Sequence, residues 1–148
     1  MSEKIETQIL IQAPAEEVWN TLTAFKSYPE WNPFVKSLEG EVREGNTIRV
    51  RISPPGGKGM TFRPVVLKLI RNTEFRWRGH LLFPGIFDGE HYFKLEDQGN
   101  GTTTFIHGEL FSGFLVPLFR KQLSTNTLMG FEQMNAKLKQ VVEGKRIQ

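Results

Sequence analysis

Hydrophobic and polar residues alternate in some segments of the chain and recur every three or four positions in others, and these two periods predict its strands and helices. Residues 4–13 alternate, with one face formed by Ile5, Thr7, Ile9 and Ile11. This period of two is typical of a strand with one buried face. Residues 14–25 follow with an apolar stripe of helical spacing, formed by Val18, Trp19, Leu22 and Phe25. Because Pro14 suits the first position of a helix, we expect a short amphipathic helix there.

The middle of the chain is a series of short apolar segments separated by turn-forming residues. Residues 28–34 contain Pro29 and Pro33, which permit at most one helical turn. The pattern then predicts six strands, at residues 35–42, 47–53, 61–70, 74–82, 89–96 and 102–111. Together with the first strand they make a seven-stranded antiparallel meander.

Helical spacing returns near the C-terminus, at Phe119, Leu123, Thr127, Phe131, Met134, Leu138 and Val141. This stripe predicts one long helix over Leu115–Glu143, with Gly144 as its C-cap. An apolar helix stripe and the inner face of a sheet must cover each other. We therefore expect an α+β fold, with a curved seven-stranded antiparallel sheet around a long C-terminal helix and two short helices near the N-terminus.

The hairpin of residues 89–111 carries polar groups on the face that should be buried. If Glu96 pairs with Thr102 across the five-residue loop 97–101, three further cross-strand pairs follow: Phe93 with Phe105, His91 with His107, and Gly89 with Glu109. The inner face then holds His91, Phe93, Leu95, Phe105, His107, Glu109 and Phe111. Burying a neutral polar group without a partner costs on the order of 2–7 kcal/mol. Two imidazoles and a carboxyl group among phenylalanines therefore indicate a lined cavity.

Three interpretations of these polar groups remain open. His91, His107 and Glu109 are either ordinary buried groups that satisfy one another, or groups that orient the polar head of a ligand. In the first case His107→Phe should lower the melting temperature; in the second it should hold or raise stability while weakening binding. The third interpretation, a metal site, is disfavoured because the spacing matches no zinc motif, and no metal and no cofactor are expected.

Composition narrows the classes of function. The 148 residues suit one domain, spanning 1–148, and contain no cysteine, which excludes disulfides and thiol chemistry. The net charge of +3 is small and the basic residues are interleaved with acids, so we expect no nucleic-acid partner. The apolar runs are too short to insert in a membrane and no signal peptide is evident, so we expect a cytoplasmic protein. No nucleotide fingerprint or catalytic triad is present, and the catalytic residues stay unassigned.

Several aromatic residues are candidates for the walls of the cavity. Trp31 follows the first helix, and Trp77 shares a face with the side-chain-free Gly79. Arg76 and Arg78 fall on the opposite face, where we expect solvent. The Phe83–Phe87 segment is unusually apolar for a loop, which suits either a lid over the cavity or a homodimer contact.

Five segments together carry a family resemblance, namely residues 11–19, 28–34, 77–79, 89–93 and 107–113. With the order of elements, they resemble the helix-grip superfamily of START lipid-transfer domains and pollen-allergen-like proteins, and locally its bacterial polyketide cyclase/dehydrase-like (SRPBCC) branch. The resemblance implies a cavity between the sheet and the C-terminal helix that binds a hydrophobic small molecule such as a lipid, polyketide or isoprenoid-like compound. It also leaves open a cyclase or aromatase that uses the same cavity, and a protein-interaction module of the co-chaperone or antitoxin type.

The expected ligand-binding residues combine the inward strand positions with the inward face of the helix. They are Trp31, Trp77, His91, Phe93, Phe105, His107, Glu109, Phe111, Phe131 and Met134.

Overall fold

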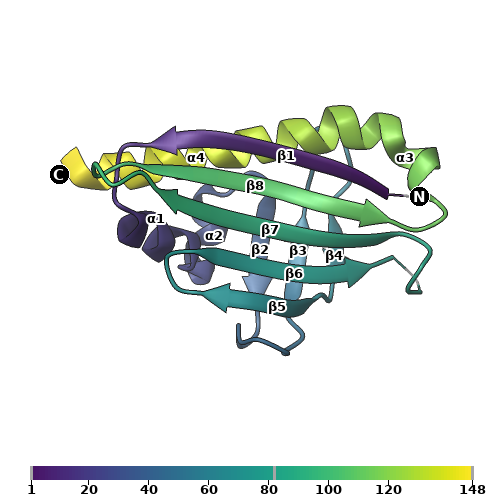
Figure 1. The fold of residues 1–148 in the computed structure, drawn as a ribbon. Coiled ribbons are helices and arrows are strands. Elements are labelled where there is room, and N and C mark those ends of the chain that lie inside the picture. Colours follow the sequence, from purple (N-terminus) through teal and green to yellow (C-terminus); the bar gives the residue numbers. More distant parts are fainter. Residues whose placement is uncertain (1, 82, 148) are drawn as a thin grey trace.

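The computed structural model describes residues 2–81 and 83–147, in which a curved antiparallel sheet lies against a long C-terminal helical segment (Figure 1). The sheet has the strand order β1-β8-β7-β6-β5, and every neighbouring pair is antiparallel. Its strands, in that order, are Ser2–Ile11, Thr103–Ser112, Asp88–Asp97, Glu74–His80 and Val65–Ile70. The predicted α+β helix-grip class is confirmed.

A second, smaller sheet holds the other three strands, which lie behind the first sheet in Figure 1. They are β2 (Val35–Glu39), β3 (Arg49–Ile52) and β4 (Met60–Phe62). The strand predicted over residues 61–70 is thus two strands in two sheets. Pro64 lies at the break, where a residue without a backbone N–H cannot continue a ladder. For this reason the described residues form eight strands in place of the predicted seven.

Two short helical segments and one long one complete the fold. Near the N-terminus lie α1 (Ala15–Leu22), the 3₁₀ turn η1 (Phe25–Ser27) and α2 (Tyr28–Trp31). Pro14 is the N-cap of α1 and not its first helical residue. The C-terminal segment runs through α3 (Val116–Gln122), the π-helical turn η2 (Leu123–Thr127) and α4 (Leu128–Ile147). The helix therefore continues beyond Gly144, and the predicted C-cap at that residue is wrong.

The β7–β8 hairpin has the predicted faces in a different register. The pairs are Leu95 with Phe105, Phe93 with His107, His91 with Glu109 and Gly89 with Phe111. The ladder runs one pair further than expected because Asp97 still pairs with Thr103, and Gln98 N–H donates to the Thr102 carbonyl within the loop. A shift of two residues exchanges partners but keeps every side chain on its face. The inner face of the hairpin is therefore the one that its alternation predicts.

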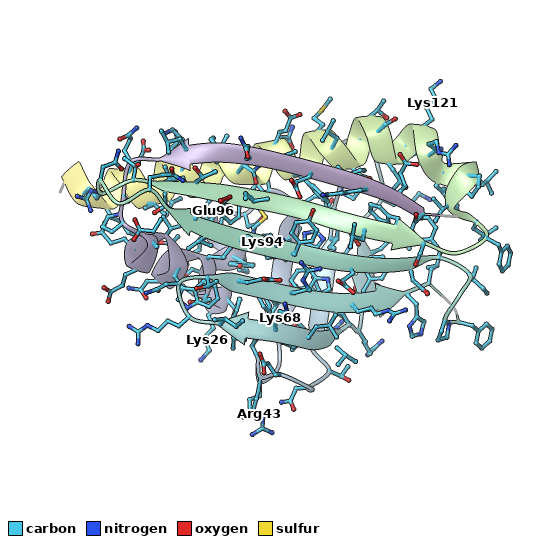
Figure 2. The ribbon with its side chains drawn as sticks, in the orientation of Figure 1. Lys26, Arg43, Lys68, Lys94, Glu96 and Lys121 are labelled. Atoms are coloured by element: carbon cyan, nitrogen blue, oxygen red, sulfur yellow. The ribbon has the colours of Figure 1, made fainter. Side chains whose placement is uncertain are left out.

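The outer face of the large sheet is mostly polar, although Leu10 and Leu110 are exposed on it. Figure 2 shows Lys68, Lys94 and Glu96 over this face, turned away from the C-terminal helix. The expectation of a solvated Arg76 is wrong, since its side chain is only 13% exposed and pairs with Glu74 and Glu90. No helix in the described ranges is both long enough and apolar enough to cross a membrane.

Candidate functional site

A cavity of about 180 Å³ lies where the large sheet, the small sheet and the π-helical turn meet. Strands β6–β8 supply one wall, β3 and β4 another, and η2 a third. The lining is mainly aromatic and aliphatic, and includes Phe62, Trp77, Phe87, Phe111 and Leu123. Its polar side chains are Glu109, Thr127 and, in an exposed position, His80. An apolar enclosure with few polar groups is typical of a small-molecule site.

Two glycines form part of the cavity floor. Gly79 on β6 and Gly89 on β7 are cross-strand partners, and both line the cavity. A Cβ on Gly89 would overlap the Oε2 atom of Glu109, so the missing side chain is what lets this carboxyl group lie over the sheet. A Cβ on Gly79 would meet only Pro64, at an ordinary 3.5 Å. The sequence thus makes room for the carboxyl group at one particular glycine.

A chain of hydrogen bonds leads from Glu109 into the interior. Glu109 Oε1 lies 2.9 Å from His91 Nδ1, and His91 Nε2 lies 2.7 Å from His107 Nε2. On the far side, His107 Nδ1 lies 2.9 Å from Asn135 Oδ1. Asn135 Nδ2 then lies 2.7 Å from Thr7 Oγ1, and that hydroxyl lies 3.0 Å from the main-chain oxygen of His107. Every member is thereby held by at least one neighbour.

Aromatic rings enclose the two imidazoles. Trp77 stacks on His91 at a centroid distance of 4.8 Å, and Phe131 stacks on His107 at 4.1 Å. Phe34 stacks on His91 at 6.2 Å and also lines the cavity. Neither histidine is exposed to solvent. The rings therefore exclude water from the two imidazoles.

Burial shifts the pKa of each titratable member toward its neutral form. It lowers the pKa of His91 to about 3 and that of His107 well below its usual value. Burial also raises the pKa of Glu109 to about 8, although its side chain keeps 15% exposure on the cavity side. The His91–Glu109 contact therefore joins two neutral groups at pH 7, not a cation and an anion.

The predicted site residues fall into three groups. Trp77, Glu109 and Phe111 line the cavity. Behind them, in the closed core, lie His91, Phe93, Phe105, His107, Phe131 and Met134. Trp31 is half-buried on α2, where its ring packs against Tyr28, and it is not part of the cavity lining.

Sequence reasoning missed several residues of the site. Asn135 is the most informative, because it is a polar residue within the apolar stripe of α4 and its side chain is buried. A polar residue at an apolar position of the helical pattern indicates a buried polar contact, and the sequence contained this signal. Phe34, Leu123 and Gly89 carry no comparable signal, since their place in the lining depends on how the two sheets meet.

The apolar loop before β7 has one aromatic side chain in the interior and another at the surface. Phe87 packs against Phe111 and Phe119 and lines the cavity. Phe83 is 69% exposed, and Phe114 and Leu118 are exposed to a similar degree. In the described part of the chain, no group of three His, Asp or Glu has an arrangement suited to a metal ion.

Comparison with known proteins gives a family match over almost the whole chain. Residues 2–143 match the family described as polyketide cyclase / dehydrase and lipid transport. No curated protein matches the chain at a significant level.

Solved structures share the fold at low sequence identity. The ZhuI aromatase/cyclase from a Streptomyces species aligns with a TM-score of 0.79 and 15% identity, over 100% of this chain and 97% of that one. A norcoclaurine synthase point mutant from Thalictrum, in complex with a transition-state analogue, aligns with a TM-score of 0.76 and 13% identity, over 99% and 97%. A START superfamily protein from Mycobacterium smegmatis aligns with a TM-score of 0.69 and 19% identity, over 93% and 98%.

Proposed function

Because the chain belongs to the polyketide cyclase / dehydrase and lipid transport family, we propose that it binds a small hydrophobic molecule in the cavity between its two sheets and the π-helical turn. The observation that carries the proposal is the cavity itself, which has apolar walls and one inward carboxyl group. Surfaces of this kind are costly to leave against water, and a ligand that fills them gains contact with Trp77, Phe87 and Phe111.

The volume of the cavity argues for a compact ligand. At about 180 Å³, it is close to the ~150 Å³ engineered cavities that hold benzene and below the ~300–1,000 Å³ of drug-sized sites. A molecule of about one or two rings fits this range, whereas an extended lipid or polyketide chain needs a larger enclosure. Among the ligand classes that the sequence suggests, which are lipid, polyketide and isoprenoid-like compounds, a short isoprenoid-like compound is the best match, and a compact aromatic compound fits the same volume.

A matched pair of leucine variants tests the proposal. Leu123 lines the cavity, whereas Leu118, one helical turn and a half earlier, is 70% exposed. Leu123→Trp fills the cavity and should abolish binding of 2-methylnaphthalene in calorimetric titrations, while Leu118→Trp should bind it as the unmodified chain does. Circular dichroism checks that both variants fold. Equal binding by Leu123→Trp and Leu118→Trp would place the ligand elsewhere and refute the proposal.

A second candidate function is a cyclase- or dehydrase-type reaction in the same cavity. Two observations favour it, namely the family description and the presence of a carboxyl group with a raised pKa against an apolar wall. A carboxyl group that holds a proton near neutral pH suits general acid catalysis, provided that the proton moves to the oxygen that faces the cavity. Turnover of a bound β-hydroxy ketone by the unmodified chain, lost in Glu109→Gln, would establish this function; binding without turnover would leave the carrier function alone.

A further inference from the structure

The last acceptor in the buried hydrogen-bond chain fixes the direction of the bonds that precede it. Thr7 Oγ1 lies 3.0 Å from the main-chain oxygen of His107. A carbonyl oxygen can only accept, so the Thr7 hydroxyl donates its single proton to this atom. Thr7 must then accept from its other neighbour, the side-chain amide of Asn135.

This requirement orients Asn135 and, through it, His107. The Nδ2 amide of Asn135 donates to Thr7, which turns its Oδ1 toward His107 Nδ1. That nitrogen must carry a proton, because the amide oxygen only accepts. If the amide were reversed, Oδ1 would face the Thr7 hydroxyl, whose single proton already goes to the His107 carbonyl. The contact between Asn135 and Thr7 would then contain no hydrogen. The backbone carbonyl therefore selects the Nδ1-protonated tautomer of His107.

The same logic passes through His91 to the cavity. A neutral His107 with its proton on Nδ1 has a bare Nε2, so His91 must donate from Nε2 across the 2.7 Å contact. His91 then has a bare Nδ1, and the proton in its 2.9 Å contact with Glu109 belongs to the carboxyl group.

The proton between His91 and Glu109 has a second possible position, on His91, which would make the two residues a charged pair. An imidazolium at His91 beside a carboxylate at Glu109 would keep the other bonds unchanged. It would bury a cation among Trp77, Phe34 and Phe131, and burial opposes this state from both sides by lowering the histidine pKa and raising that of the carboxyl. The neutral pair is the favoured state.

We infer that Glu109 is an uncharged carboxylic acid whose free oxygen accepts a hydrogen bond from the ligand, and that the ligand is an uncharged compound with a hydroxyl group, an alcohol or a phenol. This inference rests on the proposed function, since it names the ligand class for the same cavity. Oε1 is engaged by His91, whereas Oε2 lies over Gly89 at the cavity floor. An acid that donates through one oxygen presents the other as an acceptor, which a hydroxyl group satisfies.

The same geometry excludes a carboxylate head group such as that of a fatty acid. A carboxylate offers only acceptor oxygens, and it would meet another acceptor at Glu109 Oε2. No lysine or arginine is among the described residues that line the cavity, so its charge would have no partner there. The titratable groups near Glu109 are His91 from the neighbouring strand β7 and His80 from β6.

Three matched compounds test the inference: 2-methylnaphthalene, 2-naphthylmethanol and 2-naphthoate. They share one ring system and differ only in the head. At pH 7 the alcohol should bind on the order of tenfold more tightly than the hydrocarbon, and the carboxylate on the order of tenfold or more weakly than the alcohol. In Glu109→Leu the preference for the alcohol over the hydrocarbon should vanish. Glu90→Gln, which removes a carboxyl group from the outer face of β7, is the control and should keep it.

The outcomes separate this inference from the proposed function. Binding of 2-naphthoate as tight as that of the alcohol overturns the inferred ligand class and leaves the proposed function standing. If none of the three compounds binds, the proposed function fails. The protonation state of Glu109 is then measured from the infrared difference spectrum between the unmodified chain and Glu109→Gln at pH 6. A protonated-carboxyl band lost in Glu109→Gln supports the inference, and a carboxylate band lost in its place overturns it.

Discussion

The two faces of the large sheet carry similar side chains in opposite electrostatic states. On the outer face, Arg76 pairs with Glu74 and Glu90, and Tyr92 donates to Glu6. The hydrogen bond from Tyr92 lowers the pKa of Glu6, which favours its charged form. On the inner face, burial keeps the Glu109–His91 pair neutral. Contact with water and the presence of a cationic partner, and not residue type, decide which state a strand carboxyl adopts, since Glu74 is only 11% exposed but pairs with Arg76.

The difference also concerns how each group would respond to the loss of a partner. The outer carboxyl groups of Glu6 and Glu90 are 39% and 31% exposed, so water can replace a lost neighbour. His107 and Asn135 are buried with all their polar contacts inside the protein. Removing one inner partner therefore orphans another group, which costs more than the bond itself contributes.

His107→Phe should give the largest effect. The substitution leaves the His91 Nε2–H and the Asn135 oxygen without partners, and each such group costs about 1–3 kcal/mol. We expect a loss of roughly 2–5 kcal/mol in the free energy of unfolding, measured with urea. Tyr92→Phe, on the outer face, should lose about 1 kcal/mol or less, because Glu6 is 39% exposed and water can replace the lost hydroxyl. This replaces the expectation from sequence that a ligand-orienting His107 could be exchanged for phenylalanine without cost. Similar losses in the two variants would remove the distinction between the faces.

Gly89→Ala should come next. The added methyl group overlaps the Glu109 carboxyl, which must move away from the cavity floor. Overpacking of this kind costs about 1–3 kcal/mol. Gly79→Ala is the matched control on the neighbouring strand, because its methyl group meets Pro64 at an ordinary distance. Thermal unfolding compares the stabilities of the two variants. A larger loss of stability in Gly79→Ala than in Gly89→Ala would show that the carboxyl does not lie over Gly89.

The pH dependence of stability should differ between Glu109 and its amide. Burial raises the pKa of Glu109 from 4.5 to about 8, so the folded state holds the proton more tightly than the unfolded chain. Its contribution is complete below pH 4.5 and is lost as the pH rises toward 8. The histidines, with lowered pKa values, oppose folding only below about pH 6.5.

Between pH 6.5 and 8 the unmodified chain should therefore lose stability relative to Glu109→Gln, by on the order of 1 kcal/mol. The comparison requires urea unfolding of both proteins at several pH values in this window. A difference between them that stays constant with pH would mean that Glu109 is already ionised at pH 6.5.

Glu90→Gln should give the smallest change. It removes one of two carboxyl partners of Arg76 at a partly exposed position, and Glu74 remains 2.6 Å from that guanidinium. We expect a loss of less than about 1 kcal/mol that shrinks as salt is added. A loss comparable to that of His107→Phe would show that the outer network is as sensitive as the inner one.

Much of the fold was predictable because the signals are local. The alternation of β7 and β8 places His91, Phe93 and Glu109 on the inner face in any register that differs by an even number of residues. The register itself depends on the hydrogen bonds within one loop, which alternation does not encode. Pro64 marked the break between β4 and β5, although the apolar run across it favoured one strand.

The site was less predictable because it depends on contacts between distant segments. Nothing local in the sequence pairs Thr7 with Asn135, which are 128 positions apart. The alternation of the strand placed the Glu109 side chain on the inner face. Its neutral state, in contrast, follows from the aromatic rings around His91, which belong to Phe34, Trp77 and Phe131. Asn135 within an apolar helical stripe and Thr7 among the isoleucines of the first strand were the available clues to that network.

The tautomers of the histidines test the central claim most directly. The chain has three histidines, and a His80→Gln variant identifies the signals of the exposed one. Long-range ¹H–¹⁵N NMR spectra at pH 7 should show His107 with a protonated Nδ1 and a bare Nε2, and His91 with a protonated Nε2 and a bare Nδ1. Protonation of both nitrogens of His91 at pH 7 would mean that Glu109 is a carboxylate, and would contradict the account.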